Sequence, residues 1–174
     1  MIGHLKAEHL AAALDTAPPL KFAATVVTRF VFERYRQTMT STVGARMFGG
    51  RWNPIGIGAL YTSFERETAL AEFTRGILSQ QPLATAIMGN LIINVERAAD
   101  FTNTRFCTAL GLSLSDLTQG IKDSDYRITQ HLGALAYGHP LDALVVPSVA
   151  RPGGANLVVF SGRNLVPKAI VTAT

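Results

Sequence analysis

Cysteine is almost absent from this chain, which has one, Cys107, among 174 residues. A lone cysteine forms no disulfide within the chain, and this favours a reducing compartment such as the cytoplasm. Because a single cysteine is more often a small apolar core residue than a nucleophile, we expect Cys107 to be buried and inert.

Long apolar segments are also missing. No run reaches the roughly 18 residues that a membrane-spanning helix needs. The N-terminus lacks the basic region followed by an apolar stretch that marks a secretory signal. The sequence therefore predicts neither a membrane span nor a signal peptide.

Charged residues are sparse, at 16%, whereas hydrophobic residues reach 48%. This composition is too apolar for a disordered chain, and the length predicts one domain, 1–174. The net charge is +4 and the isoelectric point about 9.6, without a polybasic run, which suits an anionic ligand or an acidic partner. A non-enzymatic module that binds nucleic acid or protein stays open, although no aromatic ribonucleoprotein motif is present.

Hydrophobic periodicity predicts a mixture of strands and helices without a βαβ rhythm. The predicted strands are 22–32, 59–62, 90–95, 141–147 and 157–160. The predicted helices are 4–15, which forms an N-terminal extension, 62–78, 113–119 and 125–137. The stretch 37–48 reads as a loop. We therefore expect an α+β fold with small, mostly antiparallel sheets flanked by short helices.

The predicted helix 62–78 carries a carboxylate of interest. Thr62 and Glu65 have the spacing of a capping box and indicate a start there. We expect its buried stripe to consist of Leu70, Phe73 and Ile77. Glu72 lies instead between Ala69 and Gly76 on a face of small residues. A carboxylate on that narrow face can project into a pocket.

The most informative block is 49–54, Gly-Gly-Arg-Trp-Asn-Pro, followed closely by Tyr61 and Glu72. Arg51 offers a planar fork of donors for phosphate or carboxylate. Tyr61 offers an aromatic face with a hydroxyl, and Glu72 adds a negative charge. Together they suit a ligand that is anionic at one end and becomes cationic at its reacting centre, as NAD does when its bond to nicotinamide breaks.

Each residue also has a structural interpretation. Arg51 fits a surface turn, Tyr61 a core position and Ser148 a plain turn after proline, while Glu72 could pair with Arg75 on an exposed helix face. Arg29 is more telling, because a charge inside an apolar strand requires a partner.

Several motifs together resemble the RES domain, a family named for its Arg, Glu and Ser. The resemblance spans about residues 22–165. Its motifs are Arg29-Phe30, Gly44-Ala45-Arg46, the block 49–54, Leu60-Tyr61-Thr62-Ser63, Ala69-Leu70-Ala71-Glu72 and Val146-Pro147-Ser148. By matching motifs, Arg51, Glu72 and Ser148 correspond to the Arg, Glu and Ser of the name. The family often has Tyr where this chain has Phe30.

This resemblance implies a fold like that of ADP-ribosyltransferases and a bacterial toxin paired with an Xre-type antitoxin. It implies NAD as the substrate, with Arg51, Tyr61 and Glu72 as catalytic residues. Arg29, Phe30 and Ser148 would join Arg51 and Tyr61 in binding NAD. ADP-ribose would pass to a protein target, or to water or phosphate in an NAD glycohydrolase or phosphorylase. Nucleic acid would be contacted only through the antitoxin.

No metal site is expected. His131 and His139 have no His or Cys at metal-ligand spacing, so we expect surface or satisfied core roles. Gly56 and Gly58 lack the third glycine and the helix of a Rossmann fingerprint, so NAD would be held in another manner. The large aromatic residues Trp52, Phe101 and Phe106 are expected in the core or in a pocket wall.

Overall fold

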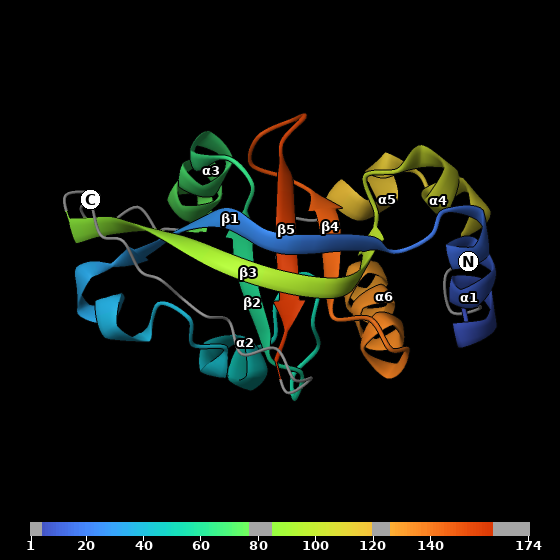
Figure 1. Cartoon of the computed structure of the whole chain (residues 1–174), viewed down its shortest axis with the longest axis horizontal. Helices are drawn as coiled ribbons and strands as arrows, with labels where there is room; N and C mark the ends of the chain where they lie inside the picture. The colour runs from blue at the N-terminus through green and yellow to red at the C-terminus, as the bar shows by residue number, and fades with distance from the viewer. Residues whose placement is uncertain (1–4, 77–84, 120–125, 162–174) are drawn as a thin grey trace.

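Five β-strands close into a single barrel in the order β1-β2-β5-β4-β3 (Figure 1). The computed structural model describes residues 5–76, 85–119 and 126–161. The strands are β1 Leu20–Phe32, β2 Ala59–Ser63, β3 Ala86–Asp100, β4 Ala143–Pro147 and β5 Ala155–Phe160. Their runs of Val, Ile, Leu and Ala explain why these segments form strands. The expectation of separate small sheets was therefore wrong.

The strand pairs are antiparallel except for one. β3 runs parallel to β4 from Ala98 to Asp100. β1 and β3 form a long antiparallel ribbon, whereas β1 joins β2 only through the pair Thr28 and Ser63. The predicted antiparallel character is thus confirmed, and the barrel closes through one short contact.

Helices of the described ranges lie around the barrel (Figure 1). They are α1 Ala7–Thr16, the 3₁₀ helix η1 Glu33–Thr38, α2 Val43–Phe48, α3 Arg66–Gly76, α4 Thr104–Ala109, α5 Leu114–Thr118 and α6 Arg127–Gly138. In Figure 1, α1, α4, α5 and α6 gather at one end, and α3 lies near the other. In the described ranges, no helix is long and apolar enough to span a membrane.

The described residues form two hydrophobic cores, one on each face of the barrel wall. The inner core takes residues from all five strands, including Val27, Leu60, Leu91, Val145 and Leu157. The outer core packs the opposite face of β2, β4 and β5 against the helices, and its large aromatic residues are Trp52, Phe101, Phe106 and Phe160. Alternation along each strand therefore decides which of the two cores a side chain faces.

Helix α3 begins later than the sequence predicted, at Arg66. Thr62 belongs to β2, where its hydroxyl donates to the carbonyl of Leu157 (2.9 Å), so it cannot cap a helix. The buried residues of α3 are Thr68 and Ala69, while Leu70 and Phe73 are half-buried. The expected apolar stripe was therefore wrong, and its third member, Ile77, lies outside the described residues.

Three other helical segments test the predicted secondary structure. The stretch 37–48 is not a loop, since it contains the end of η1 and all of α2. The helix predicted at 113–119 is confirmed as α5, with a capping box between Ser113 and Asp116. Helix α4 was not predicted; Asn103 caps it by accepting from two backbone N–H groups.

Candidate functional site

A pocket of about 450 Å³ opens between β1, α3 and the ends of β2, β4 and β5. This volume is typical of small-molecule sites. Of the residues that the structure describes, the charged ones lining the pocket are Arg29, Arg51, Arg75 and Glu72. Three guanidinium groups and one carboxylate give the pocket a cationic character that suits an anionic ligand.

Arg29 enters the pocket from the middle of β1. Its Nη1 donates to the carbonyl of Met39 (2.7 Å) and lies 3.5 Å from the carbonyl of Ser41. Burial lowers the pKa of Arg29 to about 10, which still leaves the side chain charged at neutral pH. Among the described residues, the hydrogen bonds of Arg29 use only Nη1. Its other donors can therefore serve a bound anion.

Arg51 sits on the turn between α2 and β2. Its Nη1 donates to the carbonyl of Gln119 (2.8 Å), and its guanidinium carbon lies 4.3 Å from the ring centre of Tyr126. Burial is the main cause that lowers the pKa of Arg51, and Tyr126 opposes this shift. The cation–π contact and the carbonyl fix the plane of the guanidinium at the pocket wall.

Tyr61 lines the pocket, but its hydroxyl is committed to the same turn. It donates to Oδ1 of Asn53 (2.7 Å) and accepts from the backbone N–H of Trp52 (2.9 Å). Burial is the main cause that raises the pKa of Tyr61, so the hydroxyl stays protonated. Tyr61 thus holds the turn that carries Arg51.

Two glycines let this turn pack closely. A Cβ at Gly50 would lie 2.6 Å from the Tyr61 hydroxyl, and one at Gly133 of α6 would overlap the backbone carbonyl of Trp52. Gln130 of α6 also donates to the carbonyl of Gly50 (2.9 Å). The turn is therefore held by Tyr61 of β2 on one side and by α6 on the other.

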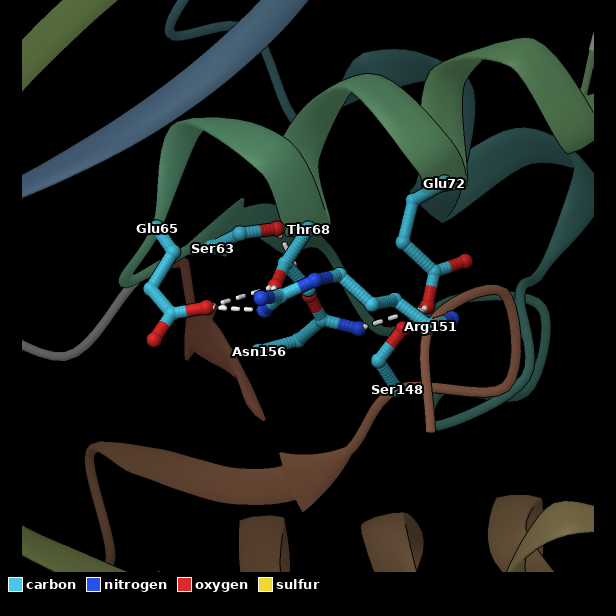
Figure 2. A network of polar contacts seen from close by, with 7 residues as sticks. All are labelled: Ser63, Glu65, Thr68, Glu72, Ser148, Arg151 and Asn156. Atoms are coloured by element: carbon cyan, nitrogen blue, oxygen red, sulfur yellow. Dashed lines mark hydrogen bonds and ion pairs between the residues drawn. The ribbon is translucent and has the colours of Figure 1, made fainter. Parts of the chain in front are cut away.

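Glu72 lines the pocket from α3, and its carboxylate accepts three hydrogen bonds. Its Oε1 accepts from Oγ of Ser148 (2.7 Å), Nδ2 of Asn156 (2.9 Å) and the N–H of Val149 (3.2 Å). Figure 2 shows the second oxygen pointing away from Ser148 and Asn156. In the described part of the chain Glu72 forms no ion pair with Arg75, so its role is not that of an exposed helix pair.

The loop between β4 and β5 docks on the start of α3. The backbone N–H of Arg151 donates to Oγ of Ser148 (3.0 Å), and its guanidinium binds Glu65 and Oγ1 of Thr68. Figure 2 shows this network from Glu65 to Ser148. A Cβ at Gly154 would lie 2.5 Å from Oγ1 of Thr68, so the close docking requires glycine.

Comparison with known proteins identifies the family. The model of the RES domain matches residues 26–173. The chain belongs to the RES domain family. Among solved structures, the RES domain described here is similar to one titled as the crystal structure of the M. tuberculosis MbcT-MbcA toxin-antitoxin complex. The TM-score is 0.63 and the identity 26%, covering 88% of this chain and 82% of that chain. No curated protein matches the sequence.

The structure brings most of the predicted site residues of this RES domain together. Arg29, Phe30, Arg51, Tyr61 and Glu72 all line the pocket. The ring of Phe30 lies 6.0 Å from that of Phe73, and the two form an aromatic side of the pocket.

Ser148 is placed differently, because it is buried and its hydroxyl points to Glu72. Its hydroxyl therefore contacts Oε1 of Glu72, and Ser148 is not among the residues that line the pocket.

Three pocket residues were missed by the sequence analysis as site residues. Asn156 follows the β4–β5 turn, and its part in binding Glu72 had no motif to signal it. Tyr126 was predicted only as part of the helix 125–137. Arg75 was considered only as a surface partner of Glu72, although its position three residues after Glu72 signals the same helix face.

Cys107, His131 and His139 do not line the pocket. Cys107 is buried, and burial raises the pKa of its thiol to about 11, which makes it a poor nucleophile. The ring of His131 contacts the carbonyl of Leu5 (2.7 Å), while Nδ1 of His139 is buried without a partner in the described ranges. No cluster of potential metal ligands occurs in the described ranges.

Proposed function

We propose that this protein is the toxin of a toxin–antitoxin pair, which binds NAD in the pocket and cleaves its nicotinamide–ribose bond. The single observation that carries the proposal is the convergence of Arg29, Arg51 and Glu72 on one cavity. Membership of the RES domain family and a toxin–antitoxin complex as structural neighbour support it.

The chemistry requires a carboxylate and cations at separate positions. Breaking the bond leaves positive charge on the ribose, and a fixed carboxylate stabilises that charge without reorganising. In this proposal Oε2 of Glu72 faces the ribose, since Oε1 already accepts three hydrogen bonds. Nicotinamide leaves as a neutral molecule and needs no proton from the protein.

The guanidinium groups hold the other end of the dinucleotide. Arg29 and Arg51 bind the pyrophosphate, and each charged hydrogen bond contributes about 1.5–3 kcal/mol. The ring of Tyr61 stacks on nicotinamide, while its hydroxyl keeps the Arg51 turn in place. Phe30 forms part of the apolar wall. Ser148 does not contact the ligand in this proposal but orients the carboxylate of Glu72 through its hydrogen bond.

The acceptor of ADP-ribose in this proposal is a side chain of a target protein. Water or phosphate as acceptor would make the same site an NAD glycohydrolase or phosphorylase, because all three routes share the bond-breaking step. Mass spectrometry of cell protein after brief expression separates them. Adducts of ADP-ribose on protein support transfer, whereas NAD loss without adducts supports the other two.

An Xre-type antitoxin is the proposed partner in the cytoplasm. The net charge of +4 suits an acidic protein, and the neighbouring structure contains a toxin with its antitoxin. Large apolar side chains near the Arg51 turn are exposed, including Met47 at 58%, Phe48 at 77% and Ile55 at 72%. Surface of this kind is typical of a protein that is covered by a partner.

The test is nicotinamide release from NAD by the purified protein. We expect release by the wild type; its absence from a folded sample would overturn the enzymatic proposal. The alternative of a non-enzymatic basic module would instead give salt-dependent binding of DNA or RNA without NAD turnover.

A further inference from the structure

Ser63 and Asn156 form a cross-strand pair at the end of β2 and β5. The strand register places them directly opposite each other. Oγ of Ser63 donates to Oδ1 of Asn156 (2.6 Å), and Ser63 is buried, with 3% of its surface exposed. Because Oδ1 accepts this bond, the Nδ2 side of the amide is turned toward α3.

The amide of Asn156 then reaches Glu72. Nδ2 donates to Oε1 of Glu72 (2.9 Å), the same oxygen that Ser148 and the N–H of Val149 contact. Figure 2 shows Asn156 between Ser63 and Glu72. Three donors on one oxygen hold the carboxylate in a single orientation and leave the other oxygen for the pocket.

We propose that Asn156 is a positioning residue, which fixes the carboxylate of Glu72 for the reaction. This inference rests on the proposed function. An amide is suited to the position, because it accepts from Ser63 on one side and donates to Glu72 on the other. A carboxylate at the same place would repel Glu72, and an alanine would leave Oε1 with two donors.

A variant that places a second carboxylate beside Glu72 is expected to depend on pH. Arg29 of β1, Arg51 of the turn and Arg75 of α3 line the same pocket. The backbone N–H of Arg151 donates to Ser148, while its guanidinium binds Glu65 and Thr68. In Asn156→Asp, two carboxylates would lie within hydrogen-bond distance and would share a proton on acidification. A protonated Asp donates to Glu72 as the amide does, so acid should partly restore the variant.

The test compares Asn156→Asp with Asn94→Asp, which makes the same charge change on the exposed face of β3. We expect kcat for nicotinamide release by Asn156→Asp to fall about 100-fold at pH 8, with little change in KM. The ratio of variant to wild-type kcat should rise about tenfold between pH 8 and pH 5, as the shared proton binds. Asn94→Asp should match the wild type at both pH values.

Ser63→Ala provides a second variant that introduces no charge. It removes the hydroxyl that orients the amide, so kcat should fall about fivefold, with a ratio to wild type that does not change with pH. Thermal unfolding at each pH verifies that the compared proteins are folded.

The outcomes separate this inference from the proposed function. A folded wild type that releases no nicotinamide overturns both. The positioning role alone is overturned if the wild type turns over NAD and Asn156→Asp has the same kcat as the wild type at every pH. Should Asn156→Asp fail to fold, an unchanged kcat in folded Ser63→Ala overturns it equally.

Discussion

The cationic and acidic sides of the pocket are built in different ways. Arg29 and Arg51 are each anchored by a backbone carbonyl, from Met39 and Gln119. Both carbonyls belong to connections between regular elements. Glu72 is anchored instead by Ser148 and Asn156, at the ends of the barrel strands.

This difference suggests a division of labour within the site. Among the described residues the hydrogen bonds of Arg29 use only Nη1, and its other donors remain for a ligand, so the cationic side is suited to binding. A carboxylate held by three donors has one orientation, so the acidic side is suited to stabilising charge as it develops. Changes to the cationic side should therefore alter KM, and changes to the acidic side should alter kcat.

The largest effect is expected for Glu72→Gln. The amide keeps an oxygen that can accept from Ser148 and Asn156, while the negative charge is lost. We expect kcat for nicotinamide release to fall about 1,000-fold. The melting temperature should change little, because the hydrogen bonds to that oxygen remain.

Glu67→Gln on the exposed side of the same helix is the matched control and should keep wild-type kinetics. A large loss of stability in Glu72→Gln with unchanged kcat would show that Glu72 is structural. That result would also contradict the proposal that the acidic side of the pocket determines kcat.

Arg29→Lys tests the cationic side. Lysine keeps the charge but loses the planar fork, so it cannot contact Met39 and a phosphate with the same geometry. We expect KM for NAD to rise about tenfold or more, corresponding to about 1.5–3 kcal/mol of lost binding. Steady-state kinetics against Arg34→Lys, an exposed arginine of η1, provides the comparison; a fall in kcat with KM unchanged would contradict the assignment.

Gly133→Ala disturbs the cationic side without altering any charge. The added Cβ would meet the carbonyl of Trp52 and push the Arg51 turn away from α6. We expect a loss of about 1–3 kcal/mol in the free energy of unfolding and a rise in KM.

Gly138→Ala in the same helix meets nothing within 4 Å and should be neutral or slightly stabilising. Denaturant unfolding of both variants measures the difference. Equal free energies of unfolding for the two variants would mean that the turn moves to accommodate the added Cβ without loss of stability.

The smallest effect concerns pH. Arg29 has a pKa of about 10, and burial keeps the Tyr61 hydroxyl protonated. Arg29 loses its charge only as the pH rises through about 10, so KM for NAD should be constant from about pH 7 to 9 and rise above that range. A KM that changes severalfold between pH 7 and 8 would point to another titrating group in binding.

The sequence predicted the positions of the strands, but not that they close into a barrel. Apolar runs such as that of β4 identify strands by composition alone. The barrel closes through one pair, Thr28 and Ser63, and no local pattern encodes a contact between segments that far apart. The capping box at Thr62 failed for a related reason, since the carbonyl of Leu157 takes that hydroxyl.

The candidate site was predicted where residues carry family motifs and missed where no motif marks them. Arg51, Tyr61 and Glu72 belong to family motifs, and they line one pocket. The contact of Asn156 with Glu72 depends on the register of β5 against β2 and on the docking of α3. Ser148 was predicted to bind NAD directly, whereas its hydroxyl contacts Glu72.

The most direct measurement is a crystal structure of the Glu72→Gln variant soaked with NAD. Our account predicts the pyrophosphate within about 2.7–3.2 Å of donors on Arg29 and Arg51, and the nicotinamide riboside beside Tyr61 and position 72. Electron density for the dinucleotide outside this pocket, with the pocket itself vacant, would contradict it.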